Sequence, residues 1–449
     1  MLTRSCWISG LLLTLAVLGS ATAISDLRFD EDPNLRTPRI RPLRIEGSKT
    51  WGDGFVRMPV HRHRFNDTKP RRRPDRMRKP EHTGNARRDW GWSHLDDYQG
   101  LTYMIEIYIG TPPQKVMVSI DTGSYELWVT PKCINSADPT LCRKYGLYYP
   151  QQSSSASYLG SHFQIQYGTG SAVGKYYSDT MKIAMFQVPG VQFAVADDTN
   201  YTYSGVLGLG YAYGFTTTYP TLLDMMWALR LIGAPVFSMG LGGEGDGFSE
   251  IIFGGVNRWK FTGGLEPVSI WPPIDKQDPG WIQYWVNVTS FGMTKPGRPK
   301  SIYTDEQFTM STLIDSGSTL SYIREDIVSV IGQQLNARVD PNGHYWVDCA
   351  LRKQNGTVDF GFNNERMIVS VPFKDFIWEQ YPGHCLMGVQ PADAGTTNYV
   401  LGDTFIRGAY LVFDQQSDVV WIANYYNCGD GVVTVGNSSA DTQFVRGAC

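Results

Sequence analysis

Short stretches in which apolar and polar residues alternate follow one another along most of the chain after residue 100. Two of them, at 103–109 and 115–120, are rich in Ile, Val, Met and Tyr and flank the Gly-Thr-Pro-Pro sequence at 110–113. Ile, Val and Tyr favour strands, and a cluster of Gly and Pro interrupts a strand, so we predict a hairpin here. Helical periodicity is visible in few stretches, such as 221–231 and 324–335. The pattern predicts a mostly antiparallel β protein.

The first 23 residues have a different pattern. Arg4 precedes an apolar run at 8–18, and Ala21-Thr22-Ala23 supplies the small residues of a cleavage site. A membrane helix needs about 18 or more apolar residues, whereas this run is shorter and contains polar positions. We therefore predict a signal peptide at 1–23 and no membrane anchor. The product should be secreted, either to the extracellular space or to a vacuole or another acidic compartment.

Charge divides the rest of the chain in two. Residues 24–88 hold 18 Lys and Arg against 9 Asp and Glu, whereas residues 89–449 hold 21 against 34. A solvated basic arm would give this pattern, but we favour a pro-segment at 24–88 that opposite charge holds on the acidic body. A dibasic processing protease would cut it at Arg87-Arg88. Nucleic-acid binding is disfavoured, because a secreted acidic body lacks the aromatic motifs on which bases stack.

Cysteines and sequons fit the secretory route. Once Cys6 leaves with the signal peptide, six cysteines remain, an even number that suggests three disulfides in any of 15 pairings. They are Cys133, Cys142, Cys349, Cys385, Cys428 and Cys449. None forms a C-x-x-C pair, which disfavours a zinc or redox site. Possible glycosylation sites are Asn66, Asn200, Asn287, Asn355 and Asn437.

One short sequence occurs twice in the body. Asp121-Thr122-Gly123-Ser124 follows one apolar strand, and Asp315-Ser316-Gly317-Ser318 follows another, 194 residues later. Each copy is followed at a distance by a matching glycine-containing piece, at 205–210 and at 399–403. A body of 361 residues is long for one core. We therefore predict two lobes, 89–275 and 276–449, related by a pseudo-two-fold axis, with the two turns at their interface.

Such an interface would bring two carboxylates together. Within a few ångströms they cannot both ionise easily, so Asp121 and Asp315 would share one proton and supply one acid and one base. Glycine at Gly123 and Gly317 allows close approach of the backbones. We expect the hydroxyls of Thr122 and Ser316 to make hydrogen bonds across the interface. We expect those of Ser124 and Ser318 to bond the outer carboxylate oxygens. A single copy could be an ordinary turn; two copies favour a paired site.

Other chemistries fit poorly. No Ser has Gly at both the −2 and +2 positions, so the esterase nucleophile elbow is missing. The histidines lack the H-E-x-x-H spacing of zinc hydrolases, and no G-x-x-x-x-G-K-[ST] phosphate loop is present. A metal between the two Asp residues is disfavoured, because their neighbours are hydroxyls and glycines without further carboxylates. We therefore expect no cofactor and no metal.

These motifs together resemble the pepsin family of aspartic endopeptidases. The resemblance spans 103–424 and rests on Ile109-Gly110-Thr111-Pro112-Pro113-Gln114, the two Asp-containing repeats, Leu127-Trp128-Val129, Tyr167-Gly168-Thr169-Gly170-Ser171 and Val400-Leu401-Gly402-Asp403. The segment Phe253-Gly254-Gly255-Val256, followed by Lys260-Phe261-Thr262-Gly263, resembles the fungal secreted branch of the family more than the vertebrate digestive branch. The resemblance implies an all-β, bilobal fold with two pseudo-symmetric lobes, a central cleft and a β-hairpin flap over it.

The family resemblance also assigns roles. It implies that Asp121 and Asp315 activate a water for peptide hydrolysis, and that the flap with Tyr167, Gly168 and Thr169 covers the substrate while the Tyr167 hydroxyl bonds the Trp128 indole. Fungal members that accept Lys often carry Asp at the flap position of Thr169, so a preference for bulky apolar residues is expected. The implied disulfides are Cys133–Cys142, Cys349–Cys385 and Cys428–Cys449.

We expect a monomeric enzyme, made as a zymogen, whose partners are protein and peptide substrates, its own pro-segment and the processing protease. The alternative is a catalytically inactive secreted binding or inhibitor protein with the same fold, because fold alone does not fix function. Such relatives generally lose a dyad Asp, the flap Tyr or the turn hydroxyls, all of which are present here. The sequence does not identify the natural substrate.

Overall fold

The computed structural model describes residues 54–63 and 102–449, together with the backbone of two short strands at 29–30 and 39–40. Within the second range, residues 131, 137, 168–169, 201, 212–216, 244–245, 247–248, 272–282, 394–397 and 437 are excluded. Cys6, the proposed signal peptide and the Arg87-Arg88 site therefore lie outside the described residues. In the part of the chain that is described, no helix has the length and apolar character needed to cross a membrane.

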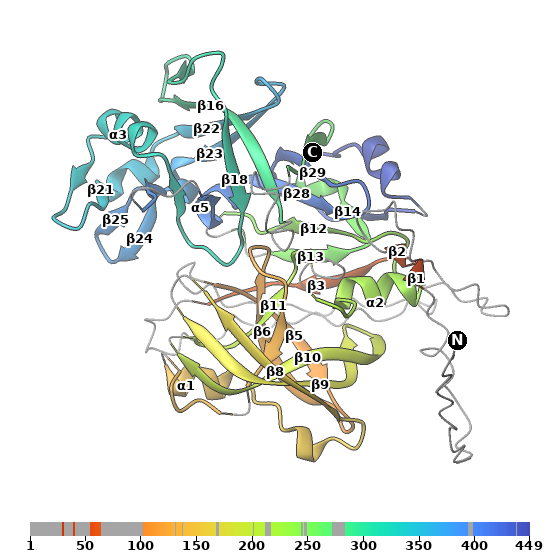
Figure 1. Cartoon of the computed structure of the whole chain (residues 1–449). Coiled ribbons are helices and arrows are strands. Elements are labelled where there is room, and N and C mark those ends of the chain that lie inside the picture. Colours follow the sequence, from red (N-terminus) through yellow and green to blue (C-terminus); the bar gives the residue numbers. More distant parts are fainter. Residues whose placement is uncertain are drawn as a thin grey trace, which may run out of the picture.

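Strands dominate the structure, as the alternating pattern predicted (Figure 1). The N-terminal lobe has one eight-stranded sheet. In spatial order its strands are β4 (His61–His63), β5 (Thr102–Ile109), β6 (Gln114–Asp121), β11 (Gly205–Gly208), β7 (Leu127–Val129), β10 (Phe186–Asn200), β9 (Ser171–Ile183) and β8 (Ser157–Gln166). The predicted hairpin is β5–β6, paired with Ile105 opposite Val118.

The C-terminal lobe has a second eight-stranded sheet. Its strands are β23 (Met367–Pro372), β22 (Thr357–Phe362), β16 (Trp285–Thr294), β18 (Met310–Ile314), β27 (Tyr399–Leu401), β19 (Ser321–Ile323) and β26 (Val389–Pro391), with β17 (Ser301–Ile302) paired to β16. A four-stranded sheet extends this lobe. It consists of β20 (Arg338–Val339), β21 (Tyr345–Val347), β25 (His384–Leu386) and β24 (Trp378–Tyr381).

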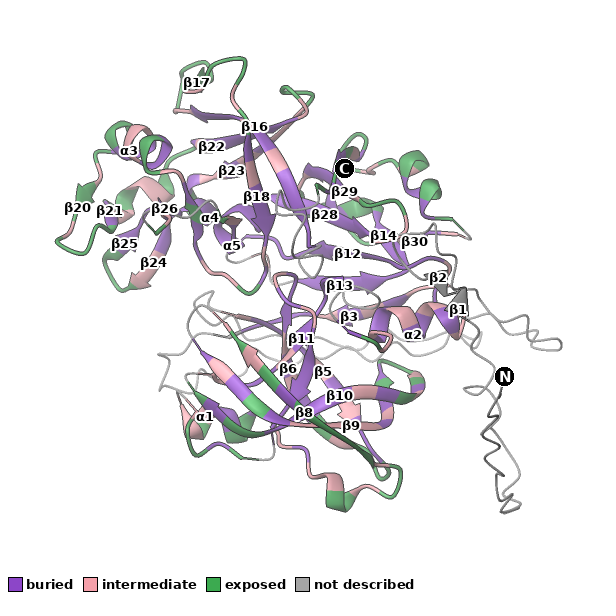
Figure 2. Cartoon of the chain, viewed as in Figure 1, coloured by how far each residue is buried: buried purple, intermediate pink, exposed green. Residues whose placement is uncertain are grey.

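A six-stranded antiparallel sheet lies between the lobes and takes strands from both halves of the chain. Its order is β15 (Glu266–Ser269), β29 (Val419–Asn424), β28 (Ala409–Asp414), β12 (Val236–Gly240), β13 (Glu250–Phe253) and β3 (Val56–Pro59). Its central strands are buried (Figure 2). The remaining strand pairs are β14 (Gly255–Asn257) with β30 (Val432–Thr434) and β1 (Phe29–Asp30) with β2 (Arg39–Ile40).

Helices are short. They are α1 (Pro139–Lys144), α2 (Leu222–Ala228), α3 (Glu325–Gln334), α4 (Phe373–Phe376) and α5 (Asp403–Ile406), with 3-10 turns at Pro150–Gln152, Arg258–Lys260, Cys349–Lys353 and Ser439–Phe444. Both helices expected from periodicity are present. The α2 helix begins at a capping box between Thr221 and Asp224. It ends earlier than predicted, because Arg230 takes a left-handed backbone conformation (φ 58°).

The two halves share one topology, which confirms the internal repeat. In the first, β6 runs parallel to β11, and β11 is antiparallel to β7. In the second, β18 runs parallel to β27, and β27 is antiparallel to β19. The conserved order of these pairings places the distal pieces, 205–210 and 399–403, directly beside the strands that lead into Asp121 and Asp315.

Residues 56–63 belong to the proposed pro-segment at 24–88, called the leader from here on, and they pair with strands of the body. The β3 strand pairs with β13 in the sheet between the lobes, and β4 pairs with β5 of the N-terminal lobe. Val56, Met58 and Val60 are buried in the main core. We expected opposite charge to hold the leader on the body. The structure shows that strand pairing and apolar burial hold it as well. The short alternating sequence at 56–60 supplies the buried side chains.

Leader arginines also reach buried groups of the body. Arg57 Nε donates to Glu250 Oε2 at 2.5 Å. Arg62 is buried, its guanidinium donates to the carbonyl oxygens of Leu241, Gly242 and Gly243, and it packs over the Tyr103 ring. These charges are paired inside the protein and not spread over a solvated arm.

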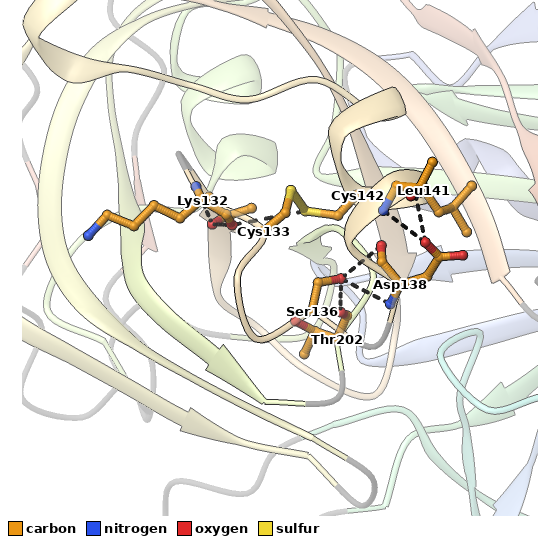
Figure 3. Close-up of a disulfide and its surroundings, with 9 residues drawn as sticks. Lys132, Cys133, Ser136, Asp138, Leu141, Cys142 and Thr202 are labelled. Carbon is orange, nitrogen blue, oxygen red and sulfur yellow. Dashed lines mark hydrogen bonds between the residues drawn. A yellow bond between two sulfur atoms is a disulfide. The ribbon is translucent and has the colours of Figure 1, made fainter.

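All three disulfides form with the pairing that the family resemblance implied. They are Cys133–Cys142, Cys349–Cys385 and Cys428–Cys449. The first joins a loop to α1, whose first turn is capped by Asp138 Oδ1 accepting from the Thr140 and Leu141 amides (Figure 3). In the same loop Ser136 Oγ donates to the Thr202 carbonyl at 2.8 Å, so the region is fixed to the chain beyond β10.

Candidate active site

Asp121 and Asp315 meet where the two lobes join. Asp121 ends β6 and Asp315 directly follows β18. A Cβ atom at Gly123 would lie 2.5 Å from Asp315 Oδ1, and one at Gly317 would lie 2.7 Å from Asp121 Oδ1. Each glycine of the repeat therefore faces the carboxyl group of the other turn, and only a residue without a side chain permits that approach.

Two hydroxyls lock the turns together across the interface. Thr122 Oγ1 donates to the Ile314 carbonyl at 2.8 Å and accepts from the Ser316 amide at 2.9 Å. The second turn mirrors this, because Ser316 Oγ donates to the Ile120 carbonyl at 3.0 Å and accepts from the Thr122 amide at 3.1 Å. Both side chains are buried. The symmetric set of four bonds is the cross-interface role that the sequence predicted for these residues.

The outer hydroxyls behave differently in the two turns. Ser124 Oγ donates to Asp121 Oδ2, as expected. Ser318 Oγ donates instead to the Leu320 carbonyl at 3.0 Å, so the prediction that it bonds the outer oxygen of Asp315 was wrong. Leu320 lies two residues on in the same tight turn, and the hydroxyl is satisfied locally before it can reach the carboxyl group.

Backbone amides and burial act on the two carboxyl groups. The amide of Gly123 bonds Asp121 and the amide of Gly317 bonds Asp315, each at Oδ1. Removal from solvent, followed by the adjacent Asp121 charge and a hydrogen bond to it, raises the pKa of Asp315 well above its usual range. Asp315 therefore keeps its proton to a higher pH than an exposed carboxyl group does.

The β8–β9 hairpin, the expected flap, lies close to Asp121 through Tyr167. Tyr167 follows β8 at the tip of the β8–β9 hairpin, and Trp128 Nε1 donates to its hydroxyl at 2.7 Å. This is the pair that the family resemblance implied. Burial and the nearby Asp121 charge raise the Tyr167 pKa, so its hydroxyl stays protonated. Gly168 and Thr169 lie outside the described residues.

Sequence reasoning missed a group of polar contacts behind the dyad. Gln283 Nε2 donates to the Gly123 carbonyl at 2.8 Å, which ties the start of the C-terminal lobe to the first turn. The Tyr284 hydroxyl donates to the Leu209 carbonyl at 2.6 Å and accepts from Gln415 Nε2 at 2.7 Å. No motif marks these residues, because the contacts join segments far apart in sequence.

The predicted glycosylation sites have different environments. Asn200 and Asn355 are exposed, whereas Asn287 is half-buried within β16. Asn66 and Asn437 lie outside the described residues. Exposed positions at a strand end and a turn are more accessible to a transferase than one in a sheet.

Comparison with known proteins identifies the family. A model of the eukaryotic aspartyl protease family matches residues 102–425. The probable aspartic-type endopeptidase opsB of Aspergillus fumigatus is 30% identical over 366 residues, which cover 76% of this chain and 72% of that protein. Mouse gastricsin is 30% identical over 73% of this chain and 81% of its own length. Aspartic proteinase yapsin-3 of Saccharomyces cerevisiae is 31% identical over 70% and 64%.

The fold agrees with this result. The crystal structure of the aspartic proteinase from Irpex lacteus matches with a TM-score of 0.58 and 19% identity, covering 73% of this chain and 96% of that one. Matches to fungal and mammalian enzymes have similar identity. With its repeated Asp-containing turns meeting between two β lobes, the chain belongs to the eukaryotic aspartyl protease family and is an aspartic-type endopeptidase with the pepsin-like fold.

Proposed function

We propose that this enzyme is a secreted endopeptidase, active in acid, whose Asp121 and Asp315 activate a water molecule for attack on a peptide bond. The observation that carries the proposal is the direct approach of the two carboxyl groups across the lobe interface. The raised Asp315 pKa supports a pair that holds one proton between its members.

In this mechanism the two residues have different roles. A water between the carboxyl groups loses its proton to ionised Asp121 while its oxygen attacks the scissile carbonyl carbon. Asp315 gives its proton to the carbonyl oxygen, and a tetrahedral diol results. Asp121 then passes the proton it took from water to the amide nitrogen as the C–N bond breaks, while one diol hydroxyl returns a proton to Asp315. The attacking group is water, so no covalent enzyme intermediate forms. Gly123 and Gly317 amides keep both carboxyl groups oriented.

The flap would complete the site. Tyr167, held by Trp128, lies where a hairpin can cover bound substrate, exclude water and strengthen the hydrogen bonds inside. Thr169 in place of an acidic flap residue supports a preference for bulky apolar side chains over Lys. The enzyme would be made as a zymogen with a leader that is cut at Arg87-Arg88.

The direct test is proteolysis of denatured haemoglobin across pH 2 to 8. We expect activity in acid that a statine-type inhibitor abolishes, with products cut mainly beside bulky apolar residues. A chelator serves as the control and should leave the rate unchanged, because the proposed dyad uses no metal. Folded enzyme that shows no cleavage at any pH would instead favour the inactive binding protein. Cleavage mostly after Lys or Arg would contradict the proposed specificity.

Stability should also be greatest in mild acid. Burial raises the pKa of several carboxyl groups, namely Glu126, Asp224, Glu250, Asp315 and Asp403. A raised native pKa means that the folded state binds more protons than the unfolded state, so this stability is complete below about pH 4 and is lost as the pH rises through the raised values. Carboxyl groups with a lowered pKa, such as Asp340 at about 2, contribute stability that is lost as the pH falls below about 4. Solvent screens the charges of Asp340 and Asp326, so this contribution is small.

We expect the melting temperature of the full chain to fall by about 5 °C between pH 4.5 and pH 7.5. Asp403→Asn removes one of the titrating groups and should make this fall shallower. Calorimetry at constant ionic strength measures both. A melting temperature that climbs steadily from pH 4 to pH 8 would contradict the assignment of these raised pKa values.

A further inference from the structure

A buried carboxylate that the proposed mechanism does not use lies beneath the flap. Glu126 is five residues beyond Asp121, directly before β7, and only 5% of its surface is exposed. The Tyr176 hydroxyl donates to its Oε1 at 2.8 Å, and the Tyr219 hydroxyl donates to its Oε2. Both carboxylate oxygens are therefore bonded, and by residues from two different segments.

These partners connect the flap to the segment that follows Asp121. Tyr176 lies on β9, the strand that leaves the flap, and Tyr219 lies in the segment that leads into α2. Glu126 and Trp128 are two residues apart in extended backbone, so their side chains lie on the same face. Trp128 holds Tyr167 at the flap tip, and Glu126 holds the flap stem through Tyr176.

The aromatic rings around the carboxylate form one packed group. Phe163 on β8 packs at 6.5 Å from Trp128 and edge-on at 5.6 Å from Tyr176, measured between ring centroids. Tyr176 is edge-on to Tyr219 at 5.7 Å. Two of these rings carry a hydroxyl that needs an acceptor inside an apolar cluster, and the Glu126 carboxylate supplies it to both.

We propose that Glu126 is a positioning residue that fixes the flap hairpin over the catalytic site. Its carboxyl group fixes the position of β9 relative to β7 through Tyr176, and it holds the segment that contains Tyr219 against β9. The inference rests on the proposed role of the flap in covering substrate. A leucine at this position would remove the carboxyl group to which both hydroxyls donate, whereas a glutamine would still accept from one of them.

Two measurements on the full chain test this. The first is hydrogen exchange in the hairpin at 157–183, which requires no catalytic activity. The second is the separation of KM from kcat on a peptide substrate. Glu126→Leu should raise KM and hairpin exchange about tenfold, and should leave kcat within about twofold, because the dyad is untouched. Glu126→Gln should recover much of both losses.

Glu106→Gln is the matched control. Glu106, on β5, also accepts from a tyrosine hydroxyl, that of Tyr108 at 2.6 Å, and pairs with Lys115. Its strand meets β9 only at Met181 and Lys182, at the opposite end of the hairpin from Tyr167. Its variant should match wild type in KM and in hairpin exchange. If Glu126→Leu does not fold, Tyr176→Phe and Tyr219→Phe each remove one bond and should produce smaller changes of the same kind.

Hairpin exchange and KM equal to wild type in these variants would overturn the proposal, as would faster exchange spread evenly over the N-terminal lobe. If the wild-type enzyme cleaves nothing in acid, the proposed function fails, and hairpin exchange alone still decides the role of Glu126.

Discussion

Asp121→Asn and Asp315→Asn are each expected to cleave denatured haemoglobin at least about a thousandfold more slowly than wild type, a loss of about 4 kcal/mol of transition-state stabilisation. Asparagine fills the same space but cannot exchange a proton. At Asp121 the water would have no base, and at Asp315 the substrate carbonyl would have no acidic donor. The cross-interface bonds of Thr122 and Ser316 do not involve either carboxyl group, so both variants should fold.

The measurement is kcat at the pH optimum of the wild-type enzyme, with circular dichroism to confirm the fold. Asp359→Asn is the matched control. Asp359 is buried in the C-terminal lobe, where Thr294 and Thr357 hydroxyls donate to it at 2.8 and 2.7 Å. Its replacement should cost stability and leave kcat within about twofold. A dyad variant that retains more than a tenth of wild-type activity would contradict the mechanism.

Removal of the leader before folding is the second change with a large expected effect. A chain that begins at Asp89 should refold from denaturant with less than about a tenth of the yield of the chain that begins at Ile24. Burial of Val56, Met58 and Val60 contributes about 5 kcal/mol. Without β3, the outer edge of β13 loses its partner strand.

Charge adds to this loss. Glu250 is buried and would lose Arg57, and the carbonyls at 241–243 would lose the Arg62 guanidinium. A buried carboxylate without its cation is strongly destabilising. Yield is measured by gel filtration and acid proteolysis after refolding, and the peptide 24–88 added in trans should restore it. Equal yield and activity from the two chains would show that the leader is dispensable for folding.

The sequence was informative where a pattern is local or repeated. The β-favouring residues at 103–109 and 115–120 around the turn at 110–113 predicted β5 and β6, and the repeat predicted that Asp121 and Asp315 meet. Only the structure showed that Ser318 bonds Leu320, because the choice between two acceptors in one turn depends on ångström-scale geometry. The hydrogen bonds of Gln283 and Glu126 were also missed, since neither belongs to a motif.

The leader shows the same division most clearly. Its charge was visible in the sequence and predicted attachment to an acidic body. The five alternating residues at 56–60 are too few to be recognised as a strand by periodicity, and their partner, β13, is almost 200 residues away.

The sequence by itself therefore determined the class of fold, the family and the two catalytic candidates, because these depend on residue types and spacings that the chain carries locally in each half. Tertiary structure decided that Asp315 is buried with a raised pKa, that the strand at 56–59 pairs with β13, and that Trp128 and Glu126 bond Tyr167 and Tyr176. Those features depend on burial and on contacts between distant segments, and both arise only when the two lobes pack together.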